Sequence, residues 1–170
     1  MQKVKLPLTV DPVRAAQKML DFDGIIKTEL LTRLAESTQS VVSDANVTLS
    51  FDFDRRHLAV MHGRADVEVV LTCQRCQEGF NHTASVEFCY SPLLKPEEED
   101  EFPEAYEPAE VDENGEINLI QIIEDELIIE LPQIAMHDEA DCKASGNMTC
   151  GEIPIADERP NPFAILKNRS

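Results

Sequence analysis

The 170-residue sequence predicts one α+β domain: an antiparallel β-sheet of about five strands with flanking helices and an acidic, irregular C-terminal part. Three observations predict this class. Residues 39–90 alternate apolar and polar side chains with the period of a strand. Asp11-Pro12 and Asn118 carry the signals that open helices on either side of this region. Acidic residues then concentrate after residue 90. The sheet could curl into a barrel, and the pattern leaves barrel and open sheet as alternatives.

The chain divides into four parts within this single domain. Residues 1–90 hold a strand, two helices and a β-meander, and residues 91–116 form an acidic loop rich in proline. Residues 117–132 form a helix, and residues 133–170 form an irregular tail with a short terminal helix that Asn161-Pro162 opens.

The N-terminal part begins with an edge strand from Val4 to Val10, because Pro7 cannot donate to a sheet. Asp11-Pro12 then opens a helix that runs to about Leu20. Gly24 falls in the connection to a second helix, Thr28 to Ser37. The inward side of this second helix is predicted to carry three leucines, Leu30, Leu31 and Leu34.

The meander is predicted to contain at least four strands between Gln39 and Tyr90. Val47 to Phe53 alternates cleanly, and Asp54-Arg55-Arg56 forms a polar turn. Leu58 to Met61 forms a short return strand that Gly63 breaks. A long hairpin, Arg64 to Tyr90, follows and carries Cys73-Gln-Arg-Cys76 at its tip.

The C-terminal half is predicted to add a short strand at Glu107–Val111 and a turn at 112–115. Asn118 caps a helix from Leu119 to Leu131, which Pro132 ends. The apolar arc of this helix, with Glu126 and Glu130 on or beside it, is predicted to face the core, and a partner-binding face is the alternative. Three polar residues, Gln121, Glu124 and Asp125, are predicted to cover the solvent side.

The net charge of −18 is uneven along the chain. Residues 1–90 hold 10 basic and 12 acidic residues, whereas residues 91–158 hold 2 basic and 21 acidic ones. Residues 159–170 carry 3 basic residues and no acidic one. This balance opposes general attraction to phosphate backbones and favours either a basic protein partner or plain solubility.

No apolar run exceeds four residues, so no membrane span is expected, and the N-terminus lacks the apolar core of a signal peptide. A cytoplasmic protein is the expectation. Five cysteines, an odd number, then argue for reduced thiols or a metal rather than disulfides.

Cys73 and Cys76 have the spacing of half a zinc site, which needs about four soft ligands. The second half could be Cys142 with Cys150, or His137 with Cys142. Two reduced, inert thiols are the simpler alternative. A thioredoxin-like thiol is a third interpretation, although a strand rather than a helix follows Cys76. Cys89 is predicted to be a small buried side chain.

No arrangement of nucleophile, base and acid is present, and six glycines build no phosphate loop. We therefore expect a protein without enzymatic activity and without a small-molecule substrate. Four arginines near strand turns, Arg55, Arg56, Arg64 and Arg75, are candidates for contact with RNA or a partner. The nearby phenylalanines alternate inward and are expected to lie in the core.

The whole chain resembles the bacterial YceD family of large ribosomal RNA subunit accumulation proteins. The matching stretches run in order from Gln2–Arg14 through Cys73–Cys76, Ala105–Pro108 and Glu124–Pro132 to Arg159–Leu166. The resemblance implies a cytoplasmic, non-enzymatic factor that supports synthesis, processing or stability of large-subunit (23S-type) rRNA. The implied partner is a large-subunit precursor, through its rRNA or a basic ribosomal protein. The alternatives are a zinc-dependent protein-binding adaptor unrelated to rRNA and, third, a thiol redox protein.

Overall fold

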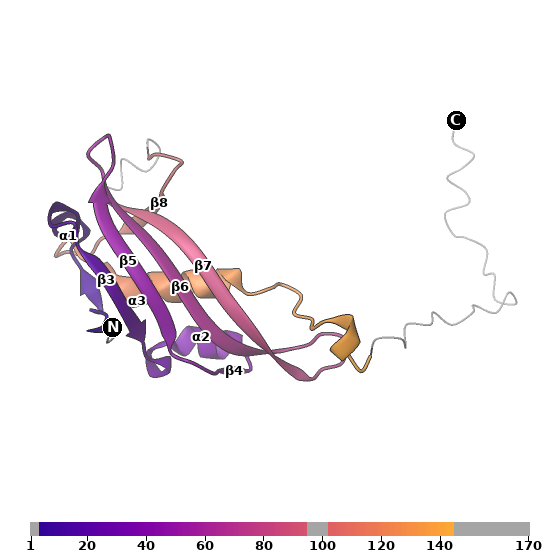
Figure 1. Ribbon diagram of the computed structural model, residues 1–170. Helices are drawn as coiled ribbons and strands as arrows, with labels where there is room; N and C mark the ends of the chain where they lie inside the picture. Colours follow the sequence, from indigo (N-terminus) through magenta and orange to yellow (C-terminus); the bar gives the residue numbers. More distant parts are fainter. Residues whose placement is uncertain (1–3, 95–101, 145–170) are drawn as a thin grey trace, which may run out of the picture.

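The computed structural model describes residues 4–94 and 102–144. Its centre is a twisted sheet of seven strands with the order β1-β3-β5-β6-β7-β8, in which β4 pairs with β6. Three helices pack on one face of this sheet, and no other helix of the described residues covers the opposite face, here called the open face (Figure 1). Within the described residues the sheet is open rather than barrel-like, because β1 and β8 lie at its two ends and are not paired with each other. It is mixed and has seven strands rather than the purely antiparallel five that were predicted, because β1 pairs in parallel with β3 and β8 in parallel with β7. The predicted α+β class is confirmed.

The first predicted strand is interrupted at residues 6–8. β1 (Val4–Lys5) joins the main sheet, and β2 (Thr9–Val10) pairs with β9 (Ile117–Asn118) in a second, two-stranded sheet. α1 (Pro12–Gln17) begins as predicted, because the Asp11 side chain accepts a hydrogen bond from the Arg14 N–H. It ends before Leu20, since Met19 adopts a positive φ of 47°.

The prediction that Gly24 lies in a connection is wrong. Residues Asp21–Ile26 form β3, which pairs antiparallel with β5 along its whole length. Gly24 pairs with Val47 on one side and with Val4 on the other, so it lies inside the sheet. This strand brings Asp21 and Asp23 onto the open face, because opposite residues of paired strands share a face.

The second predicted helix is split into a 3-10 turn, η1 (Thr28–Leu30), and α2 (Thr32–Ser37). Leu31 and Leu34 are fully buried as expected, but Leu30 is exposed because it belongs to the 3-10 turn. β4 (Ser40–Val41) and β5 (Ala45–Phe53) then begin the predicted meander. The Asp54 turn is confirmed: its carboxylate accepts from the N–H groups of Arg56 and Leu58.

The long hairpin is confirmed, but the break at Gly63 is not. β6 runs without interruption over Ala59–Thr72 and pairs with β7 (Gly79–Leu93) from Met61↔Tyr90 to Thr72↔Gly79. Gly63 lies inside β6 opposite Phe88. β8 (Glu107–Glu110) and the turn at Gly115, which has a φ of 77°, also agree with the prediction.

α3 (Leu119–Glu130) is capped by Asn118, whose side chain accepts from the Gln121 N–H. Its apolar arc packs against β7 and β6. Glu124 was predicted on the solvent side and is instead buried at 4% exposure, where it accepts from the Arg33 and Leu34 N–H groups at 2.7 and 3.0 Å. These are the N-terminal amides of α2, so α3 supplies the cap that α2 lacks in its own sequence.

The core lies between the sheet and the helices and includes Leu31, Leu34, Phe51, Ile123 and Leu127. No helix within the described residues is long and apolar enough to cross a bilayer. The acidic run at 97–101 and the tail after residue 144, with its predicted terminal helix, lie outside the described residues.

Candidate metal centre

The tip of the β6–β7 hairpin is a tight turn from Cys73 to Glu78. The Cys73 N–H donates to the Glu78 carbonyl, and the Gln77 N–H donates to the Cys73 carbonyl, both at 2.8 Å. Gln77 takes a positive φ of 63°, which reverses the chain. The turn therefore places Cys73 and Cys76 on one side of the tip, as the spacing predicted.

The segment that follows α3 returns to this tip and supplies further ligand atoms. The Gln74 N–H donates to the Ala135 carbonyl at 2.9 Å, and the Arg75 guanidinium donates to the His137 carbonyl. The His137 ring packs on Phe80 with 5.5 Å between centroids. A 3-10 turn, η3 (Glu139–Asp141), drawn in orange near the hairpin tip in Figure 1, then leads into Cys142. Two segments far apart in the sequence thus meet at one point.

Four side chains that can ligate a metal converge here: Cys73, Cys76, His137 and Cys142. One ligand atom from each lies within 4.8 Å of all the others. With Zn–S near 2.3 Å and Zn–N near 2.0 Å, ligand atoms of a tetrahedral zinc lie roughly 3.5–4 Å apart, so the cluster has the size and the soft ligand set of such a site.

The hydrogen bonding of His137 fits a ligand role. Its Nε2 lies 3.0 Å from the Asp141 carbonyl oxygen, which can only accept. This contact assigns the proton to Nε2 and leaves the lone pair on Nδ1. That Nδ1 is buried and has no hydrogen-bond partner among the described residues. A ligating histidine characteristically donates its other ring N–H to a carbonyl or carboxylate.

The two thiols of the hairpin tip differ in how readily they ionise. Burial opposes ionisation of Cys73, but hydrogen bonds from the backbone of Cys76, His137 and Arg75 outweigh it and lower the pKa to about 6. The backbone at Glu78 favours ionisation of Cys76, yet burial and the neighbouring Cys73 and Cys142 leave its pKa raised. One thiolate is therefore favoured and further thiolates repel one another, a repulsion that a bound cation would relieve.

Of the two predicted second halves, the structure brings together His137 and Cys142. Cys150 lies outside the described residues. Cys89 is half-buried rather than buried, and its Sγ lies 3.3 Å from the His62 Nδ1 on the open sheet face. No disulfide joins the four described cysteines.

The four predicted arginines do not form one patch. Arg75 lies at the metal centre, where its guanidinium contacts His137 and lies 3.7 Å from Glu139. Arg55 and Arg56 lie in the turn between β5 and β6, at the opposite end of the sheet. Arg64 lies on the open face between them, 3.4 Å from Asp66 and 3.5 Å from Glu87. The hypothesis of RNA or partner contact thus concerns three separate places.

The sequence pattern did not reveal the groove on the open face, which β3, β5, β6 and β7 build together. The strand β3 could have been predicted from the alternation of Asp21, Phe22 and Asp23 before Ile25. It was not predicted because Gly24 is typical of a connection between two helices.

Comparison with known proteins gives a family match. The family described as "Large ribosomal RNA subunit accumulation protein YceD" matches residues 61–168, more than half of the chain. A Haemophilus influenzae protein of the same description is 49% identical over 171 aligned positions, which cover 99% of this chain and 98% of that relative. No solved structure matches significantly.

Proposed function

The chain belongs to the YceD family of large ribosomal RNA subunit accumulation proteins, and we propose from this membership that it is a ribosome-biogenesis factor for the large subunit. It supports the synthesis, processing or stability of large-subunit rRNA without enzymatic chemistry, and it acts in the cytoplasm on a large-subunit precursor. The observation that carries the proposal is the 49% identity over nearly the full length of both chains.

Within this function we assign the cysteine–histidine cluster as a structural zinc site. The ion would be held by Cys73, Cys76, His137 and Cys142. It would cross-link the hairpin tip to the segment after α3. All four positions are filled by protein ligands, as in structural rather than catalytic zinc sites. This arrangement supports a binding scaffold. It argues against thiol exchange that begins at Cys73, because this side chain is fully buried and cannot reach a disulfide in another protein.

The alternative of a zinc-dependent adaptor unrelated to rRNA shares the same site and differs only in the partner. Family membership favours the ribosomal partner. The four arginines, at three places on the molecule, remain candidates for RNA contact. Arg55 and Arg56 are solvent-exposed at the sheet end, whereas Arg64 lies beside Asp66 and Glu87 and Arg75 contacts His137 at the metal centre.

Sedimentation of a cell extract that contains the tagged protein tests the partner. The proposal expects the protein to co-migrate with particles smaller than the mature large subunit, and a pull-down to recover large-subunit rRNA or ribosomal proteins. Migration only at the top of the gradient, with no ribosomal component recovered, would contradict it.

A further inference from the structure

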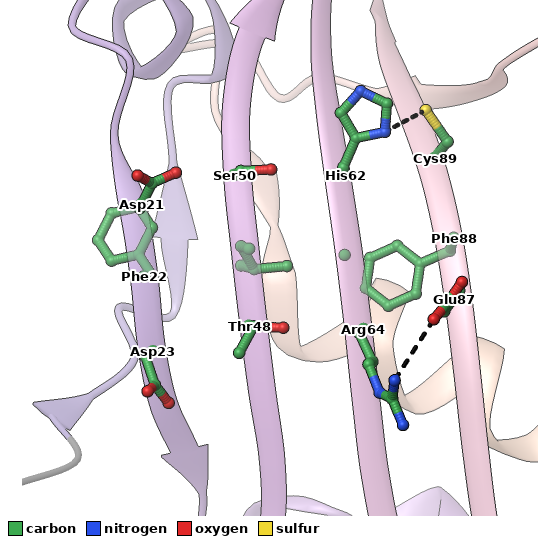
Figure 2. A pocket seen from close by; sticks show the side chains of 12 residues that line it. Asp21, Phe22, Asp23, Thr48, Ser50, His62, Arg64, Glu87, Phe88 and Cys89 are labelled. Carbon is green, nitrogen blue, oxygen red and sulfur yellow. Dashed lines mark hydrogen bonds and ion pairs between the residues drawn. The ribbon is translucent and has the colours of Figure 1, made fainter. Parts of the chain in front are cut away.

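A groove of about 890 Å³ crosses the open face of the sheet (Figure 2). One wall is a row of paired residues, Asp21, Ser50, His62 and Cys89. The other wall is the row Asp23, Thr48, Arg64 and Glu87. The floor is the backbone between the rows, because the side chains of Leu49 and Phe88 point into the core.

The open face is strongly acidic. Six carboxylates and one guanidinium point outward from β3, β5, β6 and β7: those of Asp21, Asp23, Asp52, Asp66, Glu68, Glu87 and Arg64. Arg64 already lies beside Asp66 and Glu87. None of the described basic side chains lies within ion-pairing distance of Asp21 or Asp23. A phosphate backbone would be repelled from this face, whereas a cationic group would be attracted.

The spacing of the walls suits lysine and arginine side chains. Two residues along a strand separate the rows by about 6.6 Å, and neighbouring strands lie about 4.8 Å apart. A cationic group in the groove can therefore approach carboxylates on both walls at once, as between Asp21 and Asp23. The exposed Glu87, with 78% of its side-chain surface accessible, lies at the β7 end of the same groove.

We propose that this groove binds a lysine- and arginine-rich polypeptide segment of the partner. This inference rests on the proposed function, since it names the chemistry through which a large-subunit precursor is held: a basic protein extension rather than rRNA. Within the described residues, α1, α2 and α3 all lie behind the sheet and do not cover this face (Figure 1).

Fluorescence anisotropy of the full chain with a labelled peptide of alternating arginine and alanine tests the proposal. The variant is D21N/D23N/E87Q. The control is E29Q/E36Q/E130Q, which removes three exposed carboxylates from other elements and changes the net charge equally. We expect the groove variant to weaken the peptide Kd on the order of tenfold, and the control less than about twofold. The binding should also weaken as salt is raised.

Backbone amide chemical shifts of the wild-type chain give a second measurement that needs no variant. On titration with the peptide, shifts are expected within residues 21–23, 48–50, 62–64 and 87–89. Equal weakening in both variants, shifts confined to other residues, or preferential binding of a single-stranded RNA oligonucleotide to this face would each overturn the proposal. A normal rRNA ratio in a strain that lacks the protein would instead contradict the proposed function and leave these binding results unaffected.

Discussion

The ring of Phe88 occupies the space that a side chain at Gly63 would need. An ideal Cβ on Gly63 would lie 2.0 Å from the Phe88 Cε2 and 2.2 Å from its Cζ. The two residues are directly paired across β6 and β7, so the glycine lets an aromatic ring from the neighbouring strand cross over the backbone.

Gly63→Ala should therefore destabilise the protein by about 1–3 kcal/mol, because the added methyl must displace a packed ring. Denaturant unfolding measures this. In a Phe88→Leu background the same substitution should cost much less, since the space is then released. Equal costs in the two backgrounds would contradict the packing explanation.

Glu124 links two helices, and its removal should loosen α2. Glu124→Ala leaves the Arg33 and Leu34 N–H groups without their acceptor and should cost about 1–2 kcal/mol. The control is Asp125→Asn, whose ion pair with Arg33 is solvent-exposed and should contribute less than about 1 kcal/mol. Thermal unfolding measures the stability of both variants. A similar loss of stability in the two would contradict the capping role of Glu124.

Glu126 should make stability depend on pH. Burial, together with Glu107 and Asp125, raises its pKa, while the hydrogen bond from the Tyr90 hydroxyl at 2.5 Å opposes this. A raised pKa in the folded state means that stability is highest when the carboxyl is protonated and falls as the pH rises through that pKa. Glu126→Gln should lack this loss, so its stability relative to the wild type should increase between pH 4 and neutrality. A pH-independent difference would contradict this.

The metal assignment predicts one Zn²⁺ per chain, detected as a mass difference between native and denaturing mass spectrometry. Cys73→Ser and Cys142→Ser should lose the ion and lower the melting temperature, because the binding free energy adds to folding. Cys89→Ser is the matched control and should keep the ion. If Cys142→Ser keeps the Zn²⁺ and Cys150→Ser loses it, the fourth ligand is Cys150 rather than Cys142.

The sequence predicts those features of the fold that depend on neighbouring residues. The Asp11 and Asn118 caps, the hairpin tip and the turn at Gly115 all follow from local chemistry. The errors concern residues whose role depends on distant partners. Gly63 is explained only by Phe88, Gly24 only by Val47, and the burial of Glu124 only by the open end of α2.

In the candidate metal centre, likewise, some ligands could be predicted from neighbouring residues and others only from the fold. C-x-x-C spacing identifies Cys73 and Cys76, because both ligands lie in one turn. The choice between His137 and Cys150 needs the fold, since the segment after α3 reaches the tip through contacts such as Gln74 with Ala135. The groove on the open face depends on the register of four strands, and one of these was not predicted.

The ratio of large-subunit to small-subunit rRNA in a strain that lacks this protein tests the central claim most directly. We expect the ratio to fall and to return when the wild-type chain is supplied. A strain supplied with the groove variant D21N/D23N/E87Q should recover less than one supplied with E29Q/E36Q/E130Q. An unchanged ratio in the strain without the protein would contradict the assignment to large-subunit biogenesis.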